Sequence, residues 1–213
     1  MKLYAISGLG ADHRVFECLS LNHELEAVSW LDPISDESLD AYCGRLAEKI
    51  DTSQPFGLIG VSFGGMVVVE LNKILSPEFS ILISSCATRD EIPVIYRMAG
   101  TLGILKVIPR AFFNPPKAIA HWLFGAKNKR LLSDILDDTD PRFAKWAAQK
   151  IVTWTSSQKT PNLIRIHGTK DWILPMPKNS NAIEIKQGTH FMIVDRAEEI
   201  STIVNGNTPQ QRI

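Results

Sequence analysis

Three residues spread along this sequence could do chemistry together: a serine, an aspartate and a histidine. Ser62 lies in Gly60-Val61-Ser62-Phe63-Gly64, a G-x-S-x-G pattern with an apolar run before it and another after it. Glycines at those positions let a strand turn sharply into a helix, which lifts the serine hydroxyl clear of the sheet. A neutral hydroxyl is a weak nucleophile, so it needs a histidine base and a carboxylate that orients the base. Ser62 is our candidate nucleophile.

The chain has five histidines that could serve as this base. His190 follows the last apolar run, where a loop can hold it over the end of the sheet, and it is our candidate. His167 is the rival, but it ends the preceding run, and we interpret it as a packed, hydrogen-bonded residue. His13, His23 and His121 have no such placement.

The candidate acid is Asp171, which comes four residues after His167 and before His190. The chain order Ser, Asp, His is the order in which α/β proteins with this serine turn place the three groups. Asp90, after an earlier apolar run, is the alternative acid.

The oxyanion of an attacked carbonyl needs two fixed donors. We expect the backbone N–H of Phe63, at the start of the helix after Ser62, to be one. The second is expected from the loop Ser7-Gly8-Leu9-Gly10-Ala11, at the N–H of Leu9.

Short apolar runs alternate with segments of helical periodicity. The runs predict six strands, over 3–6, 25–31, 56–61, 79–84, 163–167 and 182–185. We expect helices over 12–20, from Ser35 as N-cap to Ile50, over 64–75, and from Asp195 onward, where Asp195 and Glu198 have the spacing of a capping box. Such alternation predicts a mostly parallel sheet with helices on both faces.

Residues 89–160 interrupt this rhythm, because they contain several prolines and predict short helices without a strand. Asp140 and Pro141 are an N-cap and first-turn pair. The helix after them carries one apolar stripe, made of Phe143, Trp146, Ala147, Ile151 and Trp154. We expect a core domain of residues 1–88 and 161–213, with residues 89–160 as a helical cap over the carboxyl edge of the sheet, where such sheets bind ligands.

The segments S-G-L-G-A-D, G-V-S-F-G-G, H-G-T-K-D-W-I-L-P and G-T-H-F, in this order, resemble those of the α/β-hydrolase superfamily, and the resemblance covers essentially the whole chain. It implies a three-layer α/β-hydrolase fold with a sheet of about six strands, and a serine hydrolase that forms an acyl-enzyme on Ser62. We expect a small, apolar ester or thioester as substrate, with Trp172, Met192 and His121 as candidate substrate-binding residues. No cofactor or metal is expected.

Lys+Arg and Asp+Glu balance at 23 each, which gives no basic footprint for a nucleic acid. The three cysteines are widely spaced, which is typical of a reducing compartment, and no segment could span a bilayer. We therefore expect a cytoplasmic protein without a membrane partner. The sequence does not indicate its oligomeric state.

Other functions compete with hydrolysis. Gly8-x-Gly10 followed by Asp32 resembles a dinucleotide site, but His13 stands where a third glycine is needed. A non-catalytic binding protein would be expected to lack a member of the triad, and none is missing. A lyase or acyltransferase would keep all three residues, because fold and triad do not fix the reaction.

Overall fold

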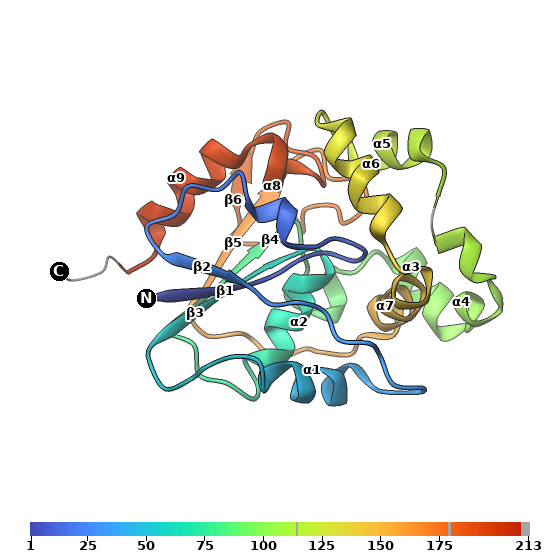
Figure 1. The fold of residues 1–213 in the computed structure, drawn as a ribbon. Helices are drawn as coiled ribbons and strands as arrows, with labels where there is room; N and C mark the ends of the chain where they lie inside the picture. Colours follow the sequence, from blue (N-terminus) through green and yellow to red (C-terminus); the bar gives the residue numbers. More distant parts are fainter. Residues whose placement is uncertain (114, 179, 210–213) are drawn as a thin grey trace.

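A six-stranded parallel sheet forms the centre of the molecule, seen here in a computed structural model that describes residues 1–113, 115–178 and 180–209 (Figure 1). The strands are β1 (Lys2–Ile6), β2 (Glu24–Ala27), β3 (Phe56–Val61), β4 (Phe79–Ile83), β5 (Leu163–Gly168) and β6 (Ile183–Ile185). Their order is β2-β1-β3-β4-β5-β6, and each neighbouring pair is parallel. The predicted three-layer fold class is confirmed.

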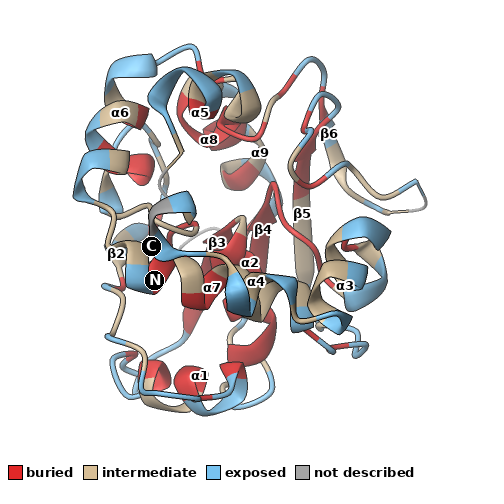
Figure 2. Ribbon diagram, turned by 90° about the vertical axis from the view of Figure 1, so that its right-hand side faces the viewer, coloured by how far each residue is buried: buried red, intermediate tan, exposed pale blue. Residues whose placement is uncertain are grey.

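The two faces of the sheet bury alternate residues of each strand, as the two-residue period of a strand requires. Tyr4 and Leu58 face α1 (Leu39–Ala47) and α2 (Phe63–Leu71), whereas Leu3 and Ile59 belong to a second cluster on the opposite face. That second cluster includes the short α8 (Met192–Asp195) and α9 (Ala197–Asn207). Figure 2 shows β3, β4 and α2 as the most completely buried elements.

Helices fill the chain between β4 and β5. They are α3 (Val94–Thr101), α4 (Ile104–Val107), α5 (Lys117–Phe124), α6 (Lys129–Asp138) and α7 (Pro141–Thr153), with single 3₁₀ turns at Arg89–Glu91 and Arg110–Phe113. Figure 1 shows these helices gathered at the side of the molecule where the strands end. The ends of the strands and these helices therefore face each other.

The N-terminus of α7 matches the sequence prediction. Asp140 accepts a hydrogen bond from the N–H of Arg142, and Pro141 opens the helix. Phe143 and Trp146 on its predicted stripe are buried in an aromatic cluster with Trp30. Phe143 and Trp146 are therefore part of the core, whereas Ile151 of the same stripe is only partly buried.

Two predicted caps are wrong. Ser38, and not Ser35, caps α1, because its hydroxyl accepts from the N–H of Ala41. Asp195 does not cap the last helix: α8 ends there, and its carboxylate accepts instead from the N–H groups of Lys127 and Asn128. These long-range bonds give the N–H groups of Lys127 and Asn128, between α5 and α6, an acceptor. If Asp195 capped the last helix instead, its carboxylate would not serve these two groups.

Other predicted boundaries also shift, and α1 ends at Ala47 instead of Ile50. The second strand ends at Ala27 rather than at residue 31, and residues 12–20 contain only a 3₁₀ turn at His13–Phe16. The helix after Ser62 ends at Leu71 instead of residue 75.

Candidate active site

Ser62 occupies a strained turn between β3 and α2. Its φ of 54° and ψ of −121° lie in a region that side-chain-bearing residues rarely adopt. The N–H of Ser62 donates to the carbonyl of Ile83 at 3.0 Å, and the hydroxyl of Ser85 donates to the carbonyl of Ser62 at 2.6 Å. These two bonds to the strand end of β4 hold the turn in place, so the serine side chain is presented above the sheet edge.

Glycine at position 64 is required by the close approach of the neighbouring loop. A Cβ on Gly64 would collide with the carbonyl oxygens of Ile6 and Ser7 at the end of β1. The loop after β1 therefore passes directly beside the serine, and a Cβ placed on Gly8 would lie 3.4 Å from the Cβ of Ser62. The segments S-G-L-G-A-D and G-V-S-F-G-G, which predicted the site, therefore meet here.

The imidazole of His190 lies between the hydroxyl of Ser62 and the carboxylate of Asp171. Its Nε2 is 2.9 Å from Ser62 Oγ, and its Nδ1 is 2.8 Å from Asp171 Oδ2. The other carboxylate oxygen accepts from the N–H groups of Ile173 and Leu174 at 3.0 and 2.9 Å. Because a carboxylate only accepts, Nδ1 carries the proton and Nε2 is left to accept from the serine. This is the arrangement that general-base activation of a hydroxyl requires.

The loops after β5 and β6 place the aspartate and the histidine next to each other. A Cβ on Gly168 would collide with the backbone of Gly188, so the two loops are in contact through their main chains. Two hydrogen bonds join them, from Lys170 N–H to the Gly188 carbonyl at 2.8 Å and from Thr169 N–H to the Ile185 carbonyl at 3.1 Å. The separation of the two side chains is therefore fixed by backbone, not by side-chain rotation alone.

The two rival residues lie elsewhere. His167 is buried, its Nε2 is 2.7 Å from the carbonyl oxygen of Leu174, and burial lowers its pKa below the ordinary histidine value. It faces Asp171 Oδ2 at 3.6 Å, behind the carboxylate. The side chain of Asp90 is 82% exposed and pairs with Arg97 at 3.2 Å. His167 is thus a strand-end packing residue, and the acid that contacts His190 is Asp171.

The N–H groups of Leu9 and Phe63 have no hydrogen-bond acceptor among the described residues. Phe63 is the first residue of α2, where an N–H has no partner within its own helix and the helix dipole favours negative charge. The loop that carries Leu9 is held by Trp30 Nε1, which donates to the Ala11 carbonyl at 3.1 Å, and by Thr139 Oγ1, which donates to the Gly10 carbonyl at 2.6 Å. Both donors are therefore free on a fixed backbone.

An apolar cavity of about 140 Å³ opens beside Ser62. Among the described residues that line it, only Ser62 and His190 have polar side chains. Leu9 and Ile173 line it from the core, and α5, α6 and α7 contribute Phe124, Leu132, Ile135, Leu136 and Ile151. Sequence reasoning placed Ile151 on a buried helix stripe but assigned none of these residues to a pocket. The buried pair Leu132 and Ile135 does have the three-residue spacing of a helix face turned inward.

The segment after His190 is tied to α5. The ring of Phe124 is 5.5 Å from the imidazole of His190, centroid to centroid, and the Phe124 carbonyl accepts from the N–H of Phe191 at 3.2 Å. Thr189 Oγ1 donates to the carbonyl of Gly125 at 3.2 Å. The helix that closes the cavity on this side is therefore bonded to the loop that carries the base.

Trp172, Met192 and His121 do not line this cavity. Trp172 follows Asp171 but points outward, is 58% exposed and packs against Trp122. Met192 is fully buried in the core beneath the sheet edge, and Nε2 of His121 is 2.8 Å from the hydroxyl of Ser133 on α6. Trp172 and Met192 lie close to Asp171 and His190 in the sequence, but their side chains point in other directions and do not enter the pocket.

Within residues 1–113, 115–178 and 180–209, no group of three or more His, Cys, Asp or Glu side chains is placed to hold a metal ion. In the same part of the chain, no helix has both the length and the apolar character needed to cross a membrane.

No protein-family model matches the chain, and no curated protein matches its sequence. Solved structures do match along almost its entire length. The enol-lactonase of Burkholderia xenovorans LB400 matches with a TM-score of 0.70 and 15% identity, over 97% of this chain and 90% of that one.

The meta-cleavage product hydrolase of Pseudomonas fluorescens IP01 has a TM-score of 0.68 and 14% identity, over 97% and 90% of the two chains. The type II thioesterase YbtT of a yersiniabactin biosynthetic pathway has a TM-score of 0.62 and 16% identity, over 97% and 92%. At these identities the likeness bears on the fold alone.

Proposed function

We propose that this chain, which has the α/β-hydrolase fold, is a serine hydrolase that cleaves an ester or thioester through an acyl-enzyme on Ser62. One observation carries the proposal: Ser62, His190 and Asp171 form a continuous hydrogen-bonded series at 2.9 and 2.8 Å, at the mouth of an apolar cavity. The backbone strain at Ser62 supports it, because strain of this kind gathers at functional sites.

In the proposed reaction, His190 Nε2 takes the proton of Ser62 as its Oγ attacks the substrate carbonyl carbon. The carbonyl oxygen becomes an oxyanion that accepts from the N–H groups of Leu9 and Phe63. His190 then gives its proton to the leaving oxygen or sulfur, and the acyl group stays on Ser62. Water attacks the acyl carbon while His190 takes the proton of the water, and the acid leaves as Ser62 regains its hydrogen. Asp171 holds the imidazole in the tautomer that both steps need.

The cavity indicates a small, apolar acyl group. A cavity of roughly 150 Å³ lined by aliphatic and aromatic side chains takes one benzene molecule, so about six carbons fit here. A charged group would be left without a partner among these walls, because Ser62 and His190 are engaged in the reaction. Thioesters stay within the proposal, since a structure similar to this chain is described as a type II thioesterase.

We further propose that residues 89–160 act as a cap on a core of residues 1–88 and 161–213. Support comes from the cavity walls, which combine side chains of α5, α6 and α7 with those of the loop after β1 and the loop that carries the base. A cap of this kind keeps bulk water from the reacting carbonyl while leaving the catalytic residues on the rigid sheet edge.

Hydrolysis of p-nitrophenyl hexanoate tests the proposal. Ser62→Ala is expected to lower kcat by about 10⁶-fold, because nucleophile and base act as a unit. Ser35→Ala, on the exposed surface far along the chain from the site, is the matched control and should keep full activity. Turnover by Ser62→Ala close to that of the parent would refute the assignment. Release of p-nitrophenol only when an alcohol or amine acceptor is added would identify an acyltransferase instead.

A further inference from the structure

The stretch between Glu91 and Asp134 is basic throughout. It contains no Asp or Glu, although the whole chain balances at 23 acidic and 23 basic residues, so the rest of the molecule carries an equal excess of acid. The basic residues of the stretch are Arg97, Lys106, Arg110, Lys117, Lys127, Lys129 and Arg130. A local excess of Lys and Arg attracts an anionic surface.

Most of these charges are available to an external partner. Arg97 pairs with Asp90 at 3.2 Å, and Lys117 pairs with Asp137 at 2.6 Å. The other basic side chains are exposed, and none forms an ion pair with an acidic side chain of the described residues; they are Lys106, Arg110, Lys127, Lys129 and Arg130.

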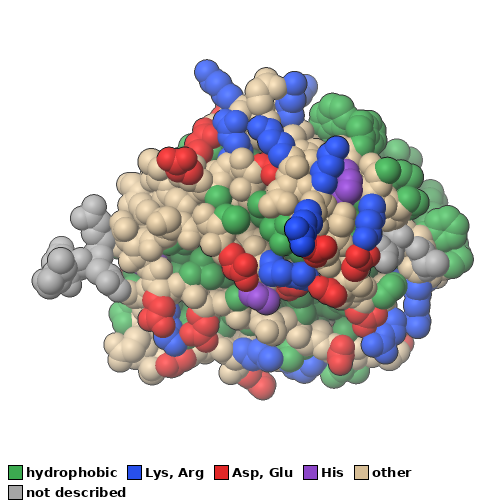
Figure 3. All heavy atoms as spheres, turned by 45° about the horizontal axis from the view of Figure 1, so that its top comes forward, with side chains coloured by type: hydrophobic (Ala, Val, Ile, Leu, Met, Phe, Trp, Pro, Cys, Tyr) green, Lys and Arg blue, Asp and Glu red, His purple; other side chains and the backbone are tan. Residues whose placement is uncertain are grey.

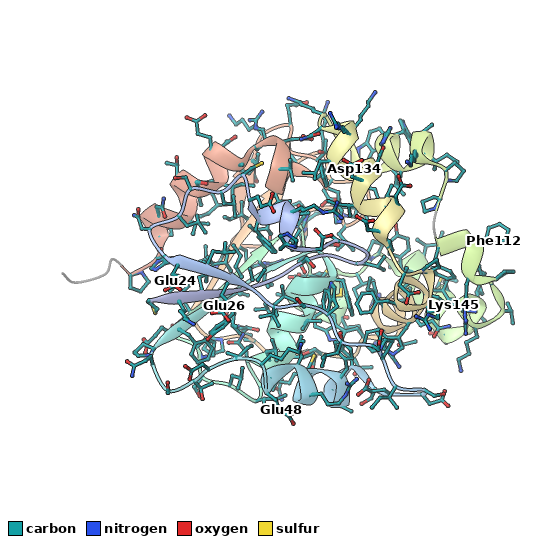
Figure 4. The ribbon with its side chains drawn as sticks, in the orientation of Figure 1. Glu24, Glu26, Glu48, Phe112, Asp134 and Lys145 are labelled. Carbon is teal, nitrogen blue, oxygen red and sulfur yellow. The ribbon has the colours of Figure 1, made fainter. Side chains whose placement is uncertain are left out.

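The same stretch also exposes several large apolar side chains to solvent. Five of them are 65–82% exposed: Ile95, Leu102, Val107, Phe112 and Trp122. Figure 3 shows hydrophobic side chains along the right-hand edge of the molecule, with Lys and Arg among them, and Figure 4 places Phe112 at the outer limit of that edge. Large apolar side chains that are exposed together along one edge of a molecule mark an interaction site. We call these five residues and the five unpaired basic ones the basic–apolar face.

We propose that the basic–apolar face binds the surface of an anionic phospholipid bilayer. Large apolar side chains on short helices enter the boundary between headgroups and acyl chains, while Lys and Arg beside them attract anionic headgroups. Ile95 lies in α3 and Leu102 directly after it, whereas the other three lie in α4, in the 3₁₀ turn before α5, and in α5 itself. A bilayer accepts side chains from several short elements at once, because a fluid surface needs no matching groove.

A second copy of the chain fits this face poorly. In a two-fold symmetric dimer the same surface patch meets itself, which would bring both sets of unpaired cations together without an acid from either copy in the stretch. We expected no membrane partner because no stretch of the sequence is apolar enough to span a bilayer, but a protein can bind the surface of a bilayer without spanning it.

Co-sedimentation with vesicles tests the proposal. The full chain should bind vesicles of phosphatidylcholine with about 30% phosphatidylserine, and bind pure phosphatidylcholine much more weakly. Lys106→Glu/Arg110→Glu should lower the affinity at least about 25-fold, from roughly fivefold for each removed cation near the surface. Val107→Ser/Phe112→Ser should also lower it. None of these residues lines the cavity, so hydrolysis of a water-soluble ester should be unchanged in both variants.

Matched variants separate the face from total charge and total hydrophobicity. Lys49→Glu/Lys186→Glu makes the same change in net charge on exposed residues outside the stretch, and Ile34→Ser/Ile74→Ser removes exposed apolar side chains elsewhere. Both should bind vesicles like the parent. A blue shift of tryptophan emission on binding, lost in Trp122→Phe, would support insertion of this face. Equal binding to neutral and anionic vesicles, no binding to either, or a dimer that Val107→Ser/Phe112→Ser dissociates would overturn the proposal.

Discussion

Replacing Leu136 by alanine should lengthen the acyl group that the cavity accepts. Leu136 lines the cavity from α6, and the substitution removes about three carbons from the wall. The parent cavity of about 140 Å³ fits about six carbons, since a slightly larger apolar cavity takes benzene. Each methylene that enters the cavity contributes about 0.8 kcal/mol, or roughly fourfold in kcat/KM. Hence kcat/KM should rise about fourfold per methylene up to a hexanoyl group and stop rising beyond it. In Leu136→Ala the rise should continue for two or three more carbons.

The assay is kcat/KM on p-nitrophenyl esters in which only the acyl chain varies. Leu131→Ala is the matched control, because Leu131 lies on the same helix at a similar degree of burial but does not line the cavity. A core Leu→Ala costs about 2–5 kcal/mol, so the half-buried Leu136 should cost less, and thermal denaturation checks that the variant is folded at the assay temperature. An optimum that stays at the parent length, or one that shifts equally in Leu131→Ala, would refute the assignment of this cavity to the acyl group. A flat profile in the parent would do the same.

Three further predictions concern the supports of the site. Asp171→Asn should lower kcat about 10⁴-fold, because the amide leaves His190 in the wrong tautomer, whereas Asp90→Asn should leave kcat unchanged. Gly168→Ala should destabilise the fold by about 1–3 kcal/mol and reduce activity, since its Cβ would displace the loop that carries His190. The control Gly44→Ala, where a Cβ meets nothing within 4 Å, should not destabilise the fold. Equal urea midpoints for the two variants would contradict this prediction. Burial lowers the pKa of His167 in the folded protein below the histidine pKa of about 6.5 in the unfolded chain. The free energy of unfolding that the neutral ring contributes is therefore present above about pH 6.5 and is lost as the pH falls below it. Urea unfolding at several pH values should therefore show a shallower loss of stability toward acid in His167→Gln than in the parent.

The contacts among the three residues of the candidate site were predictable because the parts that position them are local or fixed by chain order. The turn at Ser62 needs only a strand, two glycines and a helix, which all lie within a few residues. Asp171 and His190 each follow a parallel strand, and the carboxyl ends of parallel strands meet at one edge of the sheet. Their contact follows from that topology, even though 128 positions separate Ser62 from His190.

The cavity wall and two helix caps were not predictable in the same way. Leu132 and Ile135 reach the cavity only because α6 packs over the loop after β1, a contact without a local sequence signal. Asp195 has the spacing of a capping residue, yet its carboxylate accepts from N–H groups 67 and 68 positions away. Where a short-range and a long-range partner compete for one side chain, sequence spacing reveals only the first.

The nucleophile itself can be identified by mapping the adduct that a fluorophosphonate probe leaves on the protein. Attack on phosphorus requires a serine hydroxyl activated by a base, so a binding protein of the same fold would not react. Peptide mass analysis should find the adduct on Ser62, with labelling abolished in Ser62→Ala and strongly slowed in His190→Ala. An adduct on another serine, or labelling of Ser62 at the same rate without the imidazole of His190, would contradict the proposed catalytic triad.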